Sequence, residues 1–153
     1  MATREILYAE DNVNDVELTL AALQEHHLAN GMQVVRDGAE ALDYLYRRGQ
    51  FSGRTGPPPL LILLDLKMPK VNGLEVLRAV KHDPALRTVP VVVLTSSAED
   101  GDVRAAYELG ANAYVVKPVD FEKLVEAITR IKLFWLLTAT PAPVVIEGVA
   151  DEE

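Results

Sequence analysis

Short apolar runs alternate with stretches of helical periodicity five times along this chain. Apolar runs bounded by turn residues are typical of buried parallel strands, and apolar side chains three or four positions apart are typical of helices packed on one face. The expected strands cover residues 5–10, 32–35, 60–64, 89–94 and 113–116. The expected helices cover residues 14–26, 72–82 and 99–109, a segment around Leu42, and a segment that begins near Asp120.

The pattern inside these segments predicts helix starts, core-facing positions and loops. Asn14 or Asp15 is the expected cap of the first helix. Residues 49–59 contain three glycines and three consecutive prolines, which predicts a connecting loop. The positions expected to face the core in the first two helices are Val16, Leu20, Leu23, Ala41, Leu42, Leu45 and Tyr46.

Strict alternation of strand and helix predicts an α/β fold with parallel strands and right-handed crossovers. Five such units fit a doubly wound three-layer sandwich, for which we expect the strand order 2-1-3-4-5. We expect one domain over residues 1–137, followed by an acidic, proline-containing tail over residues 138–153.

Composition narrows the class of protein further. The formal charge of −8 argues against nonspecific nucleic-acid binding, which needs an excess of lysine and arginine. No apolar stretch reaches the roughly 20 residues of a membrane-spanning helix, and no signal peptide is visible. The absence of cysteine excludes disulfides and thiolate metal sites. We therefore expect a cytoplasmic protein without a membrane partner.

Charged side chains follow directly after three of the expected strands. In an open parallel sheet, functional groups collect at the carboxyl ends of the strands, so these side chains should meet in one cleft. They are Glu10, Asp11, Asp65 and Lys117.

Three carboxylates in one cleft need a compensating charge. Two like charges about 4 Å apart repel by roughly 4 kcal/mol at an effective dielectric constant near 20. A hard divalent cation such as Mg²⁺ relieves this repulsion better than one lysine does. The expected ligands are Asp11, Asp65 and a backbone carbonyl just after Asp65, taken as that of Lys67, while Glu10 holds a water ligand.

The same cleft offers a nucleophile for phosphoryl transfer. Asp65 ends the central strand, where a carboxylate can attack phosphorus and form an acyl phosphate. The Thr95 hydroxyl and the Lys117 ammonium can each meet a phosphoryl oxygen. Backbone N–H groups at Lys67 and Ser96 can complete the cradle. Positioning and charge neutralisation are most of what such a transfer requires.

Five motifs, in order, resemble the signature blocks of the response regulator receiver domain. They are residues 10–12 (EDN), 63–69 (LLDLKMP), 72–73 (NG), 93–97 (VLTSS) and 116–118 (VKP). The resemblance covers about residues 5–132 and implies a single-domain regulator of a two-component phosphorelay. It implies that Asp65 accepts a phosphoryl group from a sensor histidine kinase. The protein is then a phosphoacceptor that assists its own phosphorylation and dephosphorylation, and not an enzyme.

The resemblance also implies a switch. Thr95 would move toward the phosphate and Tyr114 would turn inward, which alters the surface of the fourth helix, fifth strand and fifth helix. Lys67 and Ser97 occupy positions that tune the lifetime of the phosphate. The Lys117–Pro118 bond is commonly cis in this family.

A narrower resemblance concerns the small regulators that partner phytochrome histidine kinases. The long loop over residues 49–59, the Phe134-Trp135 pair and the missing output domain are similar to theirs. The unbroken apolar row over residues 133–137 wraps around the whole helix, so it cannot all face one sheet. We expect Phe134 and Trp135 to form a homodimer surface; packing within the chain is the alternative.

Three other functions compete with this one. A magnesium-dependent aspartyl-phosphate phosphatase commonly needs an acid two positions after its nucleophile, where Lys67 stands, and a cap domain. A flavin- or nucleotide-binding module needs a phosphate-cradling loop after the first strand, where Glu10 and Asp11 would repel phosphate. A scaffold without chemistry would not need the complete acceptor set.

Overall fold

The computed structural model describes the backbone of residues 6–27 and 31–137, and side chains up to Arg130. The five strands are β1 (Ile6–Ala9), β2 (Met32–Val35), β3 (Leu61–Leu64), β4 (Val91–Thr95) and β5 (Ala113–Val116). The α-helices are α1 (Val13–Glu25), α2 (Gly38–Tyr46), α3 (Gly73–His82), α4 (Asp100–Glu108) and α5 (Phe121–Leu137). The expected loop after α2 contains one short 3₁₀ helix, η1 (Gly49–Phe51).

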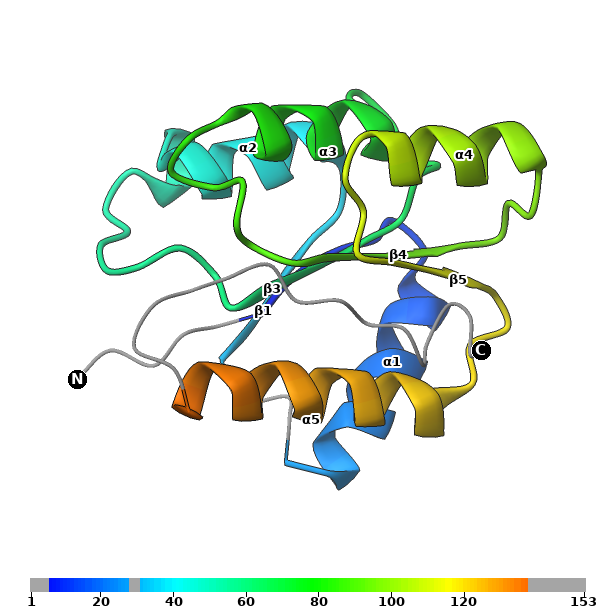
Figure 1. Cartoon of the computed structure of the whole chain (residues 1–153). Helices are drawn as coiled ribbons and strands as arrows, with labels where there is room; N and C mark the ends of the chain where they lie inside the picture. The colour runs from blue at the N-terminus through cyan, green and yellow to red at the C-terminus, as the bar shows by residue number, and fades with distance from the viewer. Residues whose placement is uncertain (1–5, 28–30, 138–153) are drawn as a thin grey trace.

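The strands form one parallel sheet in the order β2-β1-β3-β4-β5, as predicted. Figure 1 shows α2, α3 and α4 on one face of this sheet and α1 and α5 on the other. The fold is therefore the doubly wound three-layer sandwich that the alternation of elements predicted. Within the described residues, no helix combines the length and hydrophobicity of a membrane span.

Two separate cores lie on the two faces of the sheet. In β3, Ile62 and Leu64 pack toward α2, α3 and α4, whereas Leu61 and Leu63 pack toward α1 and α5. Successive side chains of a strand point to opposite faces, so a strand covered on both sides must be apolar at every position. This is why the central strand is a continuous apolar run in the sequence.

The cap of α1 differs from the prediction. Asn12, and not Asn14 or Asp15, is the N-cap, and its side chain accepts a hydrogen bond from the Asp15 amide at 3.0 Å. The Asn12 backbone is extended, so its side-chain oxygen can reach the free N–H groups of the first turn. The helix therefore begins immediately after the acidic pair, and its first turn lies beside that pair.

The inward face of α2 also corrects the prediction. Tyr44 is buried with 1% of its surface exposed, whereas Tyr46, which was expected to face the core, is 38% exposed. A helix turns about 100° per residue, so position 46 lies about 140° away from Ala41, while positions 44 and 45 lie on the same side as Ala41. The Arg48 guanidinium instead lies over the Tyr46 ring, with its Cζ 5.1 Å from the ring centre.

Candidate functional site

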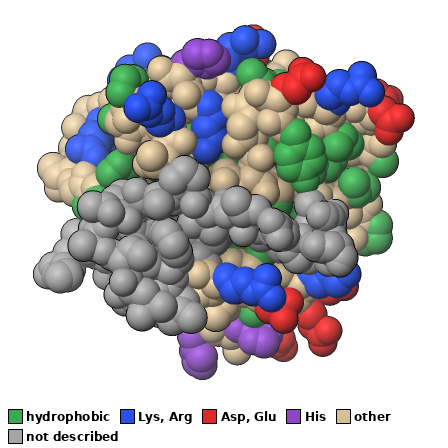
Figure 2. Space-filling model, in the orientation of Figure 1, with side chains coloured by type: hydrophobic (Ala, Val, Ile, Leu, Met, Phe, Trp, Pro, Cys, Tyr) green, Lys and Arg blue, Asp and Glu red, His purple; other side chains and the backbone are tan. Residues whose placement is uncertain are grey.

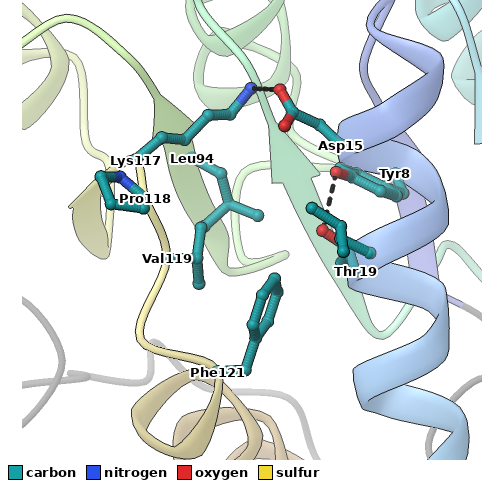
Figure 3. Close-up of a pocket in the computed structure, with 9 residues that line it drawn as sticks. Tyr8, Asp15, Thr19, Leu94, Lys117, Pro118, Val119 and Phe121 are labelled. Atoms are coloured by element: carbon teal, nitrogen blue, oxygen red, sulfur yellow. Dashed lines mark hydrogen bonds and ion pairs between the residues drawn. The ribbon is translucent and has the colours of Figure 1, made fainter.

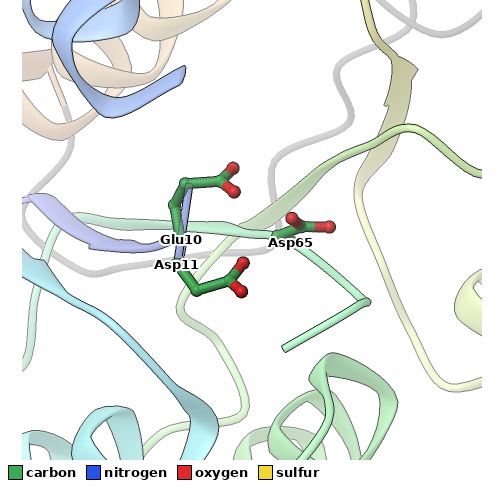
Figure 4. A group of neighbouring side chains, drawn as sticks. All are labelled: Glu10, Asp11 and Asp65. Atoms are coloured by element: carbon green, nitrogen blue, oxygen red, sulfur yellow. The ribbon is translucent and has the colours of Figure 1, made fainter. Parts of the chain in front are cut away.

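Two neighbouring strands bring the three predicted carboxylates together. The Asp65 amide donates to the Ala9 carbonyl at 3.1 Å, and the Glu10 amide donates to the Val35 carbonyl at 3.0 Å. The hydrogen bonds of the sheet thus fix the backbone at which these side chains begin. One oxygen from each of Glu10, Asp11 and Asp65 lies within 4.8 Å of the others. Figure 4 shows the three carboxylates side by side at the ends of β1 and β3.

This cluster fits a hard divalent cation. Its donors are all carboxylate oxygens, the ligand type that Mg²⁺ and similar ions prefer. Glu10 and Asp65 are buried, whereas Asp11 is exposed, so an ion could enter from the Asp11 side. Burial raises the pKa of Glu10 to about 7; the Lys117 ammonium opposes this rise, and Asp65 adds to it. A cation would favour the ionised carboxylate.

Lys117 follows β5 and closes the other side of the cluster. Its Nζ lies 2.7 Å from Glu10 Oε1, 2.7 Å from Asp15 Oδ2 and 3.4 Å from Asp65 Oδ2. Burial alone would lower the pKa of Lys117, but the hydrogen bonds to Asp15 and Glu10 outweigh it, and the pKa is raised. The Lys117 amide donates to the Thr95 carbonyl at 2.8 Å, and Lys117–Pro118 is cis. The predicted convergence of distant charges is confirmed.

Asp15 is the member of this site that sequence reasoning missed. The sequence pattern predicts only a helix cap at this position, yet the Asp15 carboxylate pairs with Lys117 across 102 positions of sequence. Figure 3 shows this pair spanning from the first turn of α1 to the end of β5. The start of the helix could have revealed this role of Asp15. A helix that begins at Val13 places its first turn, which contains Asp15, at the same edge of the sheet as the acidic pair.

Gly73 also has a structural role that the sequence did not reveal. A Cβ added at this position would lie 2.2 Å from the Asp65 carbonyl oxygen. The Gly73 amide donates to the Leu66 carbonyl at 3.0 Å, which holds the start of α3 against the loop after β3. Only glycine permits this approach, so it helps to position Asp65.

The loop after β4 contains the predicted switch residues. Thr95 is fully buried, and its Oγ1 accepts from the Ser97 amide at 3.4 Å. Tyr114 is also buried, and its hydroxyl donates to the Ser97 carbonyl at 2.8 Å. The tyrosine ring therefore already lies inward in this structure. The switching role of both residues stays a prediction.

Asp102 of α4 connects the two loops that border the site. It accepts a hydrogen bond from Ser97 Oγ at 2.5 Å, and its Oδ2 lies 3.7 Å from Lys67 Nζ. The Lys67 amide donates to Asp65 Oδ1 at 3.2 Å. The two positions expected to tune the phosphate lifetime thus share one carboxylate, beside an open depression of about 500 Å³ that Asp11 also lines.

The predicted dimer surface lies outside the described residues. Phe134 and Trp135 belong to the last turns of α5, where the structure describes the backbone alone, and residues 138–153 are not described. Elsewhere, Figure 2 shows apolar side chains on the side of the molecule where α4 and β5 lie. Tyr107 of α4 and Val116 of β5 are among the exposed large apolar residues.

Comparison with known proteins identifies the family of this arrangement. A profile described as the response regulator receiver domain matches residues 6–129. The chain is 39% identical over 135 residues to the response regulator Rcp1 of Synechocystis sp. strain PCC 6803, covering 88% of this chain and 90% of the relative. It is 43% identical over 131 residues to the probable methanogenesis regulatory protein FilR2 of Methanothrix harundinacea, covering 86% and 83%.

Solved structures show the same relationship. The bacteriophytochrome response regulator RtBRR is 52% identical with a TM-score of 0.78, covering 97% of this chain and 89% of its own. The Mn²⁺-bound form of Rcp1 is 38% identical with a TM-score of 0.74, covering 93% and 100%. The phosphorylated cyanobacterial phytochrome response regulator RcpA is 40% identical with a TM-score of 0.74, covering 91% and 98%. These matches do not favour the phosphatase alternative.

Proposed function

Because the chain belongs to the response regulator receiver domain family, we propose that it is a phosphorylation switch with Asp65 as its phosphoacceptor. Receiver domains act with histidine kinases and transmit signals rather than convert a separate substrate. One observation carries the proposal: the Lys117 ammonium lies 3.4 Å from Asp65 at the end of β3, beside two further carboxylates that follow β1.

Asp65 has the surroundings that a phosphoacceptor needs. A carboxylate oxygen forms the new O–P bond while the P–N bond to a kinase phosphohistidine breaks, and the imidazole takes up a proton. The Lys67 amide, 3.2 Å from Oδ1, orients the carboxylate for this attack. Lys117, the Thr95 hydroxyl and the Ser96 amide then bind the phosphoryl oxygens. With this set the domain assists both its own phosphorylation and its own dephosphorylation.

Receiver domains bind a divalent metal, and we assign Mg²⁺ to this one. Asp11, Asp65 and the Lys67 carbonyl would hold the ion, with Glu10 on one of its water ligands. The ion supplies neutralisation of the charge on the phosphoryl oxygens. The donor set supports Mg²⁺ over softer metals because every side-chain ligand is a carboxylate.

We assign a phytochrome-type histidine kinase as the partner and the cytoplasm as the location. Support comes from RtBRR and RcpA, which are named as phytochrome regulators, although FilR2 is named for methanogenesis. Phosphotransfer from a panel of purified histidine kinases tests the partner. Faster transfer from a kinase of another class would contradict the phytochrome assignment and leave the acceptor assignment intact.

We further propose a homodimer in which Phe134 and Trp135 contribute to the interface. The apolar row over residues 133–137 supports this, because such a row cannot be buried on one side of a helix. Sedimentation of the full chain tests it. We expect a dimer that weakens when both aromatic residues are replaced by serine, and a monomer at every concentration would contradict the proposal.

Intact-mass measurement after incubation with Mg²⁺ and acetyl phosphate tests the acceptor. We expect the wild-type chain to gain one phosphoryl group and Asp65→Asn to gain none. Asp100→Asn, at an exposed aspartate of α4, is the matched control and should be labelled like the wild type. Equal labelling of Asp65→Asn would show that another residue accepts the phosphoryl group.

A further inference from the structure

Every N–H donor of the Lys117 ammonium has a partner in this structure. A lysine ammonium carries three N–H groups, and Lys117 has three carboxylate partners. The distances to Glu10 and Asp15 are both 2.7 Å, whereas the distance to Asp65 is 3.4 Å. The ammonium thus lies nearer to the β1–α1 segment than to the side chain that accepts phosphate.

The three partners differ in their access to water. The side chain of Glu10 is fully buried and that of Asp15 is 33% exposed. Asp15 reaches Lys117 at the rim of a small pocket of about 110 Å³ between α1 and the start of α5, which Tyr8, Thr19 and Phe121 also line (Figure 3). Bulk water can therefore reach the Asp15 carboxylate when Lys117 leaves it, whereas the Glu10 side chain is closed off from bulk solvent.

We infer that the Asp15 carboxylate is a partner of Lys117 only in the unphosphorylated protein, and that a phosphoryl group on Asp65 displaces Asp15 from the ammonium. This inference rests on the proposed function of Asp65. A phosphoryl group carries about two negative charges, and its hydrogen bonds to an ammonium are about 2.7–2.9 Å long. All three N–H groups of Lys117 already have carboxylate partners, so each phosphoryl oxygen that binds the ammonium takes the place of one of them. A first oxygen replaces the long contact to Asp65 itself, and a second must replace Glu10 or Asp15.

Asp15 rather than Glu10 separates from Lys117, because separating Asp15 costs less free energy. A buried carboxylate left without its ion-pair partner loses that stabilisation and gains none from bulk water. This applies to Glu10. The Asp15 carboxylate is hydrated after separation, so its loss is partly compensated. Asp15 therefore acts as a positioning residue: it competes with the phosphoryl group for Lys117 and lowers the affinity of the site for that group.

Binding of beryllofluoride, a phosphoryl mimic, to the full-length protein tests this competition. Fluorine NMR titration in the presence of Mg²⁺ gives the affinity of each variant. We expect Asp15→Asn to bind about threefold to tenfold more tightly than the wild type, because a weakened partner releases Lys117 more readily. Asp15→Glu should restore wild-type affinity, since it keeps the carboxylate.

Glu17→Gln is the matched control for the lost charge. Glu17 is an exposed acid of the same helix, and no hydrogen bond or ion pair joins it to Lys117. We expect its affinity to stay within about 1.5-fold of the wild type, as for an exposed charge without a close partner. Repeating the titration at about 1 M salt, where the Debye length is about 3 Å, removes long-range effects of charge and leaves the contact.

These measurements test the competition by Asp15 separately from the proposed phosphoacceptor role of Asp65. A gain in Asp15→Asn that persists at high salt, with Glu17→Gln unchanged, supports the competition. Equal affinity in Asp15→Asn and Glu17→Gln, or a gain that high salt abolishes, overturns the inference while the acceptor assignment stands. If the wild-type protein fails to bind beryllofluoride and to be labelled by acetyl phosphate, the proposed function fails, and the inference fails with it.

Discussion

Two partly buried lysines lie at opposite ends of the sheet, and their surroundings shift their pKa values in opposite directions. Lys117, at the carboxyl end, has three carboxylate partners, and its pKa is raised. Lys81, in the last turn of α3, lies near the amino ends of β4 and β5. Its Nζ donates to the Arg87 and Val89 carbonyls at 3.1 Å and 2.9 Å, and burial lowers its pKa to about 8.

The difference shows what distinguishes a reactive end of this fold from a structural one. Neutral carbonyls satisfy the Lys81 donors without balancing its charge, so these hydrogen bonds join segments of the fold, and burial of the unbalanced charge lowers the pKa of Lys81. Gly110 packs on this lysine with φ +109°, and an added Cβ would lie 3.1 Å from Lys81 Cγ. At the other end, the surplus of carboxylates leaves negative charge for a cation to balance.

The largest expected effect is the replacement of Lys117 by methionine. Removing one group that stabilises a developing anionic charge typically lowers a rate by about 10²–10³-fold, and we expect this loss in labelling by acetyl phosphate. Lys81→Met is the matched control, and its labelling rate should stay within about twofold of the wild type, because Lys81 lies at the opposite end of the sheet. Rates by intact mass measure both. Equal losses in the two variants would mean that Lys117 acts through folding alone.

A second prediction concerns Mg²⁺ and pH. The Glu10 carboxyl, with a pKa raised to about 7, binds more protons in the folded than in the unfolded protein between about pH 4.5 and 7. Without metal, this group therefore makes the free energy of unfolding fall as pH rises through that window. The proposed Mg²⁺ site consists of ionised carboxylates that meet only in the folded protein, so we expect the ion to stabilise the fold more at pH 8 than at pH 5.5.

The expected size at pH 8 is about 2.7 kcal/mol when Mg²⁺ is present at 100 times its Kd. Urea unfolding with and without the ion measures it. Glu10→Gln is the control, and its response to Mg²⁺ should vary less between the two pH values. A free energy of unfolding that is the same with and without Mg²⁺ at pH 8 would contradict a metal site at this cluster.

The smallest expected effect concerns Lys81 itself. Its folded-state pKa of about 8 lies below the usual value of 10.5, so the unfolded chain binds more protons between these pH values. The free energy of unfolding should therefore rise across this window, by about 1 kcal/mol once solvent screening of the part-exposed ammonium is allowed for. Lys81→Met should lack the rise. An identical pH profile in both proteins would show that the pKa of Lys81 is the same in the folded and the unfolded chain.

Sequence patterns predicted the site better where strands carry it than where helices do. Glu10, Asp65 and Lys117 each follow a buried strand, and parallel strands end at a common edge, so their meeting could be foreseen. Asp15 could not be placed in the same way. Its direction depends on where α1 begins, and the Asn12 cap, which sets that start, was predicted two or three residues too late.

Local sequence patterns were enough to predict the order of the elements, the order of the strands and the edge of the sheet at which the acids gather. These follow from local periodicity and from the need to cover both faces of a parallel sheet. Three features follow from packing in three dimensions: Tyr44 rather than Tyr46 is buried, Asp102 joins Lys67 to Ser97, and Lys117 lies nearer to Asp15 than to Asp65. Each depends on distances between side chains from separate elements, which packing sets and no local pattern records.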